Sequence, residues 1–229
     1  MAPGEPIPGE RGFTMNLNKL NLEVAKAASK ETGRYNLNSI HFTKDYTESS
    51  NGHIMARVTY PEQFDPSEVP DLIKTGKKED IQEFMIPADS LKGVKFPKKI
   101  SLPVLKDLYV DVESTNSNGS AKFGMTDLET TIQPEIRKME GEYPNVNACI
   151  PTSEPIFEVS LDGRYLAMMA TIAAQFQERT GEITLHFHSF TSPVVITAFN
   201  ESQKFKGLIM PMRGAARDLT KKDEPNNEG

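Results

Sequence analysis

The chain has a single cysteine, no tryptophan and no long apolar run. Because Cys149 is alone, an intramolecular disulfide is excluded, and a reducing compartment fits this composition. No apolar stretch approaches the roughly 20 residues that cross a bilayer. The Pro- and Gly-rich start, residues 1–12, lacks the basic and apolar regions of a signal peptide. We therefore expect a cytoplasmic protein with no membrane partner.

Signatures of catalysis and of cofactor binding are lacking as well. The sequence contains no Walker loop, no GxGxxG, no GxSxG and no Cys–His pattern of recognised spacing. His186 and His188 alternate along a predicted strand and share one face, but no further cluster supplies the ligands that zinc needs. We predict no catalytic residues, no metal and no cofactor. An enzyme or metal-dependent regulator that uses these histidines and nearby acidic strands is the weakest alternative.

Three passages of the chain share one pattern, in which a short strand leads into a helix and then into alternating strands. They cover residues 13–58, 84–151 and 156–213, between a flexible leader (1–12) and a disordered tail (214–229). This pattern predicts an α+β protein with antiparallel sheets.

Apolar spacing and capping residues predict the helices and strands within these passages. Asn16 or Asn18 caps a first helix that runs to about Lys30, and Asp162 caps a helix from Gly163 to about Phe176. The first helix should bury Leu17, Leu20, Val24 and Ala27 or Ala28, and the last should bury Tyr165, Leu166, Met169, Ile172, Ala173 and Phe176. Strands are expected at 38–42, 54–60, 84–86, 100–105, 108–112, 120–125, 130–136, 157–160, 183–187, 194–199 and 206–210, with a turn at 47–51, a short helix at 88–94 and a hairpin loop at 114–119.

Four separated stretches carry the most specific signal. They are Arg34-Tyr35-Asn36-Leu37-Asn38, Asn51-Gly52-His53-Ile54-Met55, Glu142-Tyr143-Pro144, and Leu208-Ile209-Met210-Pro211-Met212-Arg213. Together they resemble the bacterial DNA polymerase III beta subunit, the sliding clamp. That family has Arg-Tyr-x-Leu-Asn, Asp-Gly-His-Arg-Leu, Phe-Pro and Met-Pro-Met-Arg at corresponding places. The resemblance implies the DNA-clamp architecture, with helices on one face of antiparallel sheets. It also implies that two half-modules form a complete clamp-like domain over 13–151 and that one half-module forms half a clamp-like domain over 152–213.

The resemblance also implies an apolar cleft that receives the peptide tails of DNA polymerases and other clamp partners. The positions carried over are Leu37, Ser50, Gly52, His53, Met55, Pro144, Cys149, Leu208, Met210, Pro211, Met212 and Arg213. Leu, Met and Pro side chains offer an adaptable apolar surface, and Gly52 permits a tight turn. Two positions depart from the family, because Ile54 and Ala148 stand where arginines are usual. The rim is therefore less basic, and the preferred peptide should differ.

Duplex DNA is the second partner that the resemblance implies, although the net charge of −6 is unusual for a nucleic-acid binder. A ring that encircles DNA needs basic residues only on its inner face, so the distribution of charge matters more than its sum. Lys19, Lys26 and Lys30 recur on one predicted helix face, and Lys92 and Arg164 add charge in the later passages.

Because one and a half domains cannot close a ring alone, we expect a homo-oligomer, with four copies as one hypothesis, and a clamp loader as a further partner. The principal alternative is a clamp-derived peptide-binding or regulatory module that does not encircle DNA.

Overall fold

The computed structural model describes residues 13–33, 35–61, 83–93, 107–112, 119–126, 131–177, 179–189, 191–212 and 217–218. The chain divides into two compact units, Met1–Ile150 (unit 1) and Pro151–Gly229 (unit 2), and each is described by itself. Antiparallel sheets combined with short helices confirm the expected α+β class. The predicted strand at 100–105 and most of the predicted loop at 114–119 lie outside the described residues.

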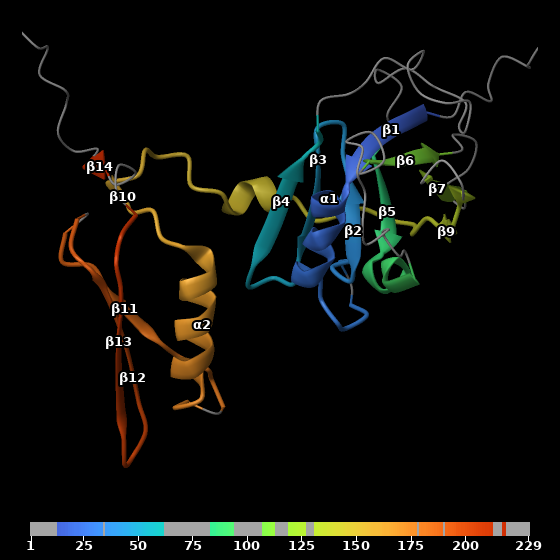
Figure 1. The fold of residues 1–229 in the computed structure, drawn as a ribbon. Coiled ribbons are helices and arrows are strands. Elements are labelled where there is room, and N and C mark those ends of the chain that lie inside the picture. Colours follow the sequence, from blue (N-terminus) through green and yellow to red (C-terminus); the bar gives the residue numbers. More distant parts are fainter. Residues whose placement is uncertain are drawn as a thin grey trace, which may run out of the picture. The chain divides into compact units, whose positions relative to one another are not determined.

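Unit 1 contains two repeats of one pattern, a strand followed by a helical segment and further strands (Figure 1). The first repeat comprises β1 (Phe13–Asn18), α1 (Lys19–Glu23), the 3-10 helix η1 (Val24–Ala27), β2 (Ser39–Phe42), β3 (Tyr46–Ser50) and β4 (Met55–Thr59). The second comprises β5 (Phe84–Pro87), the 3-10 helix η4 (Ala88–Gly93), β6 (Asp107–Val112), β7 (Ser120–Thr126), β8 (Thr131–Ile132) and β9 (Glu135–Arg137). A last 3-10 helix, η6 (Val146–Cys149), follows.

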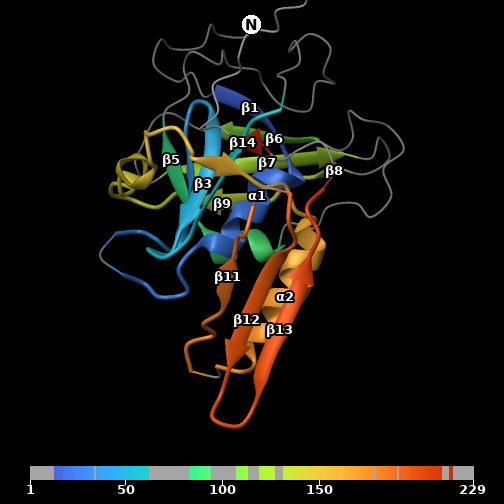
Figure 2. The ribbon, with the colours of Figure 1, turned by 90° about the vertical axis from the view of Figure 1, so that its left-hand side faces the viewer.

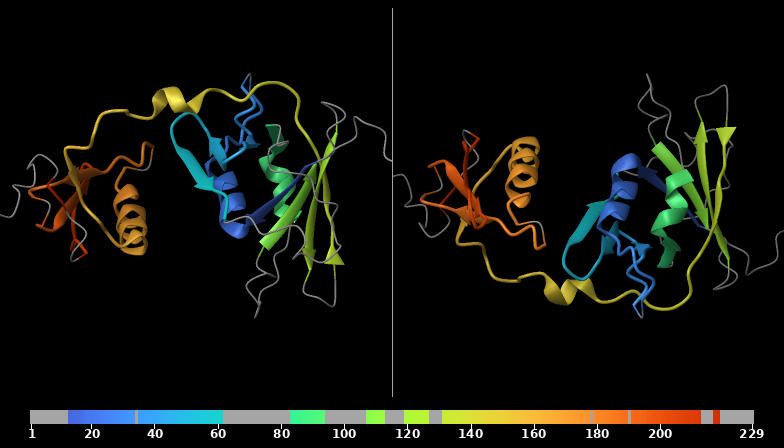
Figure 3. Two further views of the ribbon diagram at one scale, coloured as in Figure 1. Left: turned by 90° about the horizontal axis from the view of Figure 1, so that it is seen from above. Right: turned by 90° about the horizontal axis from the view of Figure 1, so that it is seen from below.

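The two repeats of unit 1 exchange their first strands. β5 pairs with β2 and extends the sheet β4–β3–β2, with Phe42 opposite Phe84. In return β1 pairs with β6 and extends the sheet of β6, β7, β8 and β9, with Leu17 opposite Leu108. All these pairs are antiparallel. Figure 3 shows α1 and η4 next to each other, flanked by the strands of the two sheets.

A single apolar core joins the two repeats. Phe42 stacks on Phe84 with ring centroids 4.6 Å apart and meets Phe123 edge-on at 6.3 Å. The buried cluster takes residues from both repeats: Leu17, Leu22, Val24, Ile40, Phe42, Phe84, Ile86, Ala88, Leu91, Val110, Ala121, Phe123 and Ile136. Burial of this shared apolar surface is the main term that stabilises unit 1.

The first helix differs from its prediction. Asn18 caps α1 in a capping box with Asn21, whereas Asn16 lies in β1. The segment becomes a 3-10 helix at Val24 and ends at Ala27, before the expected end near Lys30. Leu20 is exposed although we expected it to be buried. The apolar spacing misled here because Leu17 belongs to the strand, so the helical phase starts only after it.

The predicted turn at 47–51 is wrong, because β3 occupies most of that stretch. Four of its residues, Thr47, Glu48, Ser49 and Ser50, are polar but buried. The Thr47 hydroxyl donates to the Asn21 carbonyl at 2.7 Å, and the Ser49 hydroxyl donates to the Ser39 carbonyl at 2.8 Å. Such tertiary hydrogen bonds compensate the burial of polar groups.

Unit 2 contains a third repeat of the same pattern. It comprises β10 (Phe157–Glu158), α2 (Gly163–Ala174), β11 (Thr184–His186), β12 (Val194–Phe199) and β13 (Lys204–Ile209), followed by β14 (Arg217–Asp218). β11, β12 and β13 form an antiparallel sheet, and α2 lies against it (Figure 2). β14 pairs with β10, so two residues within the expected tail form a strand, and the rest of the tail lies outside the described residues.

The last helix begins as predicted, with Asp162 as its cap, and ends at Ala174 instead of near Phe176. Leu166, Met169, Ala173 and Phe176 pack in the small core of unit 2. Tyr165 and Ile172 are exposed by 58% and 42%, which corrects their predicted burial. The apolar surface of α2 therefore extends beyond the residues that pack in the core of unit 2. No helix among the described residues is long and apolar enough to cross a membrane.

Candidate functional site

The part of the predicted cleft in unit 1 begins with a rigid turn between β3 and β4. The Ser50 hydroxyl accepts from the Gly52 amide at 3.0 Å and donates to the Ile54 carbonyl at 2.8 Å. The Asn51 side-chain oxygen accepts from the amides of His53 and Ile54 at 2.9 and 3.0 Å. Gly52 has φ of 87°, a left-handed conformation that favours glycine. This geometry leaves His53, Ile54 and Met55 exposed.

The segment that carries Pro144 and Cys149 is attached to unit 1 at several points. The Met139 amide donates to the Met85 carbonyl at 2.8 Å, and the Asn36 side-chain amide donates to the Glu140 carbonyl at 3.1 Å. Gly141 has φ of 103°, and a Cβ there would lie 2.7 Å from Asn36 Nδ2. Leu37 and Pro144 are half-buried and Cys149 is exposed. The structure thus holds this segment beside the sheet of the first repeat.

A charged network beneath this segment was not predicted from the sequence. Glu48 is buried, and its carboxylate accepts from Arg57 Nη2 at 2.6 Å and lies 3.0 Å from His41 Nδ1. Burial opposes ionisation of Glu48, but the hydrogen bonds of His41 and Arg57 outweigh it, so its pKa is below the ordinary value. Arg57 also donates to Asn147 Oδ1 at 2.6 Å, which ties η6 to β4. No local motif signals these partners.

Tyr143 covers the same network. Its ring stacks on His41 with centroids 4.7 Å apart. Burial, followed by the nearby Glu48 carboxylate, raises the pKa of the Tyr143 hydroxyl to about 12, and the Ser50 backbone acts in the opposite direction. Among the described residues, no group forms a hydrogen bond of good geometry with the Tyr143 hydroxyl. The tyrosine therefore stays neutral and acts as an aromatic wall.

The part of the predicted cleft in unit 2 is an exposed apolar row. Leu208, Met210 and Met212 alternate along an extended segment and are all exposed, so they share one face. Buried Ile209 faces the opposite side, where α2 packs. Pro211 is half-buried, and the Met212 amide donates to the Ser160 carbonyl at 2.9 Å. Arg213, and Arg34 of the first motif, lie outside the described residues.

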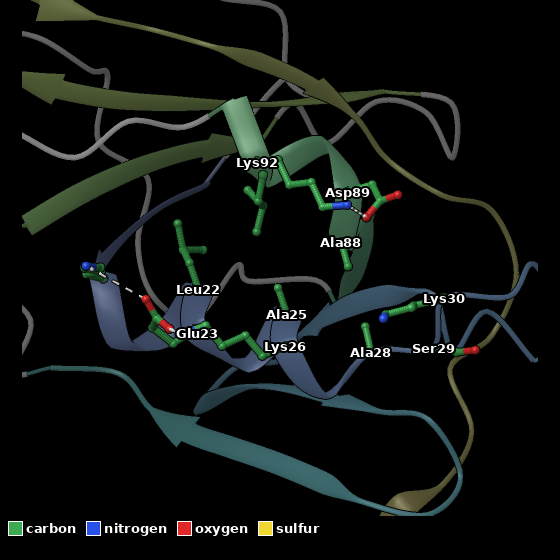
Figure 4. Close-up of a pocket in the computed structure, with 12 residues that line it drawn as sticks. Leu22, Glu23, Ala25, Lys26, Ala28, Ser29, Lys30, Ala88, Asp89 and Lys92 are labelled. Atoms are coloured by element: carbon green, nitrogen blue, oxygen red, sulfur yellow. Dashed lines mark ion pairs between the residues drawn. The ribbon is translucent and has the colours of Figure 1, made fainter. Parts of the chain in front are cut away.

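Four of the five predicted DNA-facing residues line one pocket in unit 1. Its volume is about 530 Å³, and it lies between the α1–η1 segment and η4 (Figure 4). Leu22 and Ala25 point toward η4 and form part of an apolar floor. The basic lining residues are Lys19, Lys26, Lys30 and Lys92. Although α1 is short, the fold still brings lysines from both repeats to one hollow. Arg164 belongs to unit 2.

Carboxylates already pair with three of these lysines. Glu23 contacts Lys26 and lies 3.9 Å from Lys19, and Asp89 lies 2.6 Å from Lys92. The hydrogen bond from Lys26 is the largest cause that lowers the pKa of Glu23. Lys30 has no ion-pair partner within the described part of the chain. In unit 2, Arg164 Nη2 lies 2.6 Å from the Asp162 cap. Exposed pairs of this kind are weak and exchange readily with phosphate.

His186 and His188 do not belong to a group of possible metal ligands within the described residues. His186 lies in β11 and its Nε2 is 2.9 Å from the Thr197 hydroxyl, while His188 lies past the end of this strand. Among the described residues, no group of three or more His, Cys, Asp or Glu side chains is placed to hold a metal ion.

Comparison with known proteins supports the fold. No protein-family model matches the sequence, and no curated protein matches it. Solved structures do match: the DNA polymerase III beta chain of Streptococcus pneumoniae TIGR4 (TM-score 0.59, 16% identity, 95% of this chain) and the DNA polymerase III subunit beta of Borrelia burgdorferi (TM-score 0.61, 13% identity, 93% of this chain). A DNA polymerase sliding clamp from Pseudomonas aeruginosa matches with TM-score 0.58 and 16% identity over 92% of this chain.

These matches confirm the predicted resemblance and the DNA-clamp architecture. The chain spans about half the length of the clamps that it matches, covering 53%, 52% and 54% of the three. At such low identity the likeness shows the fold alone, so the activity and partners of the complete clamps do not transfer with it.

Proposed function

We propose that this protein is a sliding-clamp-like processivity factor that tethers DNA enzymes to duplex DNA. The observation that carries the proposal is the clamp fold, which covers more than nine-tenths of the chain in solved clamps of three bacteria. The lysine pocket supports a DNA-facing surface, because lysines meet phosphates without reading bases. Several copies would close the ring, and a clamp loader would open it.

The mechanism is topological. A closed ring keeps its partner near the substrate by raising the effective concentration, and it adds no sequence specificity. Contacts with the backbone must remain weak enough for the ring to move. The ion pairs of Glu23 and Asp89 with the pocket lysines suit this requirement, since they compete with phosphate.

The partner enzyme would dock through a peptide with apolar anchors. In unit 1 the acceptor surface would consist of Leu37, the Ser50–Met55 turn with Gly52 and His53, Pro144 and Cys149. In unit 2 it would consist of the row Leu208, Met210, Pro211 and Met212, with Arg213 next to it. Each anchor would contribute roughly 25 cal/mol per Å² of apolar area that it buries.

Retention on DNA tests the proposal. Dilute protein is concentrated with nicked circular DNA, so that rings assemble around it, and the mixture is passed over a sizing column. We expect retention on the circle and release after the DNA is linearised. Replacing Lys19, Lys26, Lys30 and Lys92 by Gln should weaken retention, whereas replacing Lys204 and Lys206, which are exposed in unit 2, should not. Equal retention on circular and linear DNA would overturn encirclement.

Peptide binding tests the acceptor surfaces separately. A fluorescent peptide with leucine and phenylalanine anchors should bind the wild type, and Met55→Ser or Leu208→Ser should weaken binding by about 5- to 30-fold, the loss expected for one exposed apolar contact. Ile132→Ser is the control, because Ile132 is equally apolar and exposed but lies in β8. Equal weakening by all three variants would contradict a specific site.

The second candidate function is a peptide-binding regulatory module that never encircles DNA. The net charge of −6 and the pairing of three pocket lysines with carboxylates favour it. It predicts peptide binding without preference for circular DNA.

A further inference from the structure

We propose that unit 2 of one copy is completed by unit 2 of a second copy, and that the two exchange their first strands, β10. The inference rests on the proposed self-association and specifies which surfaces meet. It follows from a comparison of the three repeats, each of which has a leading strand, a helix and a set of strands after the helix.

In unit 1, the first described strand after each helical segment has strands on both of its edges. β2 lies between β3 and β5, and β6 lies between β7 and β1. One neighbour comes from the same repeat and the other is the leading strand of the companion repeat. β11 is the equivalent strand in unit 2, and within the described residues it pairs only with β12. One edge of β11 therefore lacks the leading strand of a companion.

Within the described residues, the leading strand β10 also lacks the partner that β1 and β5 have, namely the first strand after the helix of a companion repeat. β5 pairs with β2 of the companion repeat on one edge, and on the other it meets the segment that follows its own repeat, where the Met139 amide donates to the Met85 carbonyl at 2.8 Å. Around β10 the second kind of contact is present: the Met212 amide donates to the Ser160 carbonyl at 2.9 Å, and β14 pairs with β10. No described residue supplies the first kind. The β10 strand of each copy can therefore pair with the open β11 edge of the other copy.

One flank of α2 points to the same partner. In α1 of unit 1 the Asn21 side chain donates to the Val58 and Thr59 carbonyls of its own sheet, and Leu22, about 100° further around the helix, points toward η4 of the companion repeat (Figure 4). In α2 the flank about 100° beyond the buried row of Leu166, Met169 and Ala173 is a stripe of Ala167, Ala170 and Ala174. Ala167 is exposed and the other two are half-buried.

The side of α2 opposite the buried row carries Arg164, Thr171 and Gln175 and suits solvent. An apolar stripe beside an open strand edge is a liability unless a partner covers it.

A second copy is the occupant that satisfies both vacancies at once. The donor strand and the acceptor edge belong to the same unit, so a twofold axis makes two identical exchanges and closes the pair. Two chains would then supply three complete clamp domains, of which one is shared. Two such pairs would supply six domains, consistent with four copies in a ring.

Light scattering behind a sizing column on the full chain tests the stripe. We expect an even-numbered assembly for the wild type and half that mass, or less, for the double variant Ala167→Lys/Ala170→Lys. The matched control is Met168→Lys/Ile172→Lys, which adds the same charges to the exposed side of α2 away from the stripe and should keep the wild-type mass. Far-UV circular dichroism checks that both variants are folded. A folded stripe variant with unchanged mass, or a monomeric wild type at micromolar concentration, overturns the inference.

Cross-linking tests the strand exchange without relying on the stripe variant. In a Cys149→Ser background, chains with Glu158→Cys on β10 are mixed with chains with His186→Cys on β11, and a short bismaleimide should join the two and give covalent dimers. The cysteines are placed on separate chains because Phe157 and Phe187 already lie side by side within one chain, with ring centroids 5.9 Å apart. Chains with Glu158→Cys mixed with chains with Lys204→Cys, at the far end of β13, should not give such dimers. Equal dimer yields from the two pairs would contradict the exchange.

The DNA experiment separates this inference from the proposed function. Retention on circular DNA together with an unchanged mass of the stripe variant overturns only the exchange. Specific cross-linking without retention on circular DNA overturns only the encircling function.

Discussion

Units 1 and 2 are built from the same repeat, but only unit 1 contains it twice. Among the residues that the structure describes, the paired repeats of unit 1 share a core of 13 buried residues, whereas four form the core cluster of unit 2. A larger shared core stabilises more, because the fraction of apolar surface removed from water rises with domain size. The contrast indicates that the repeat is a building block that becomes a stable domain only when a companion supplies the missing strand and helix.

The largest expected effect comes from a substitution in the shared core of unit 1. Phe42 is fully buried and contacts aromatic rings from the second repeat. Phe42→Ala should reduce the free energy of unfolding of unit 1 by about 3–5 kcal/mol, through lost burial and the cavity left behind. Urea denaturation followed by circular dichroism measures it.

If the two units unfold independently, the transition of unit 2 stays in place. Ile196→Ala is the reciprocal variant, since Ile196 is fully buried in unit 2 and should move that transition by about 2–4 kcal/mol. A single transition that both variants shift equally would show that the units unfold together.

A smaller effect comes from the charged network, which is present only in unit 1. Glu48→Gln keeps the shape of the side chain but leaves the Arg57 guanidinium without its carboxylate, and should cost about 2–4 kcal/mol. The folded-state pKa of Glu48 is lowered, so its contribution is complete above the ordinary value of 4.5 and is lost as the pH falls below it.

The pH dependence identifies this contribution. Denaturation at pH 7 and at pH 3 should show a smaller loss of stability for Glu48→Gln than for the wild type. Glu31→Gln, at an exposed site, is the control and should follow the wild type. A wild-type pH profile for Glu48→Gln would argue against the network.

The sequence predicted those strands whose apolar and polar residues alternate and those helices whose apolar residues recur at helical spacing without interruption. The strand at 194–199 was predicted at its observed bounds, and α2 was predicted from its Asp162 cap. β3 was missed because its polar residues are buried by partners such as Asn21 and Ser39, which no local pattern reveals. The same holds for the Glu48–Arg57–His41 network, since strand pairing and not sequence spacing places its members together.

In the candidate sites, local motifs indicate some features, whereas contacts between the repeats determine others. Gly52 was predicted to permit a tight turn, and its φ of 87° and the hydrogen bonds of Ser50–Met55 agree with one, although the turn was expected earlier, at 47–51. Lysine spacing suggested one helix face, but Lys30 lies beyond η1, and the pocket exists because η4 of the second repeat brings Lys92 alongside. Exchange of leading strands between repeats is a tertiary property, so the open edge of β11 became visible only in the structure.

The smallest effect probes how closely α2 packs in unit 2. A Cβ at Gly207 in β13 would lie 2.1 Å from Met169 Cε and 3.0 Å from Phe205 Cζ. Gly207→Ala should therefore cost about 1 kcal/mol, because the flexible end of Met169 moves aside but the packing is strained. Gly163→Ala is the matched control: nothing lies within 4 Å of its Cβ, and the change should be neutral or stabilise α2 by up to about 1 kcal/mol. Urea denaturation of both variants decides, and equal shifts would mean that the α2–β13 contact of the single chain is rearranged when unit 2 meets its companion.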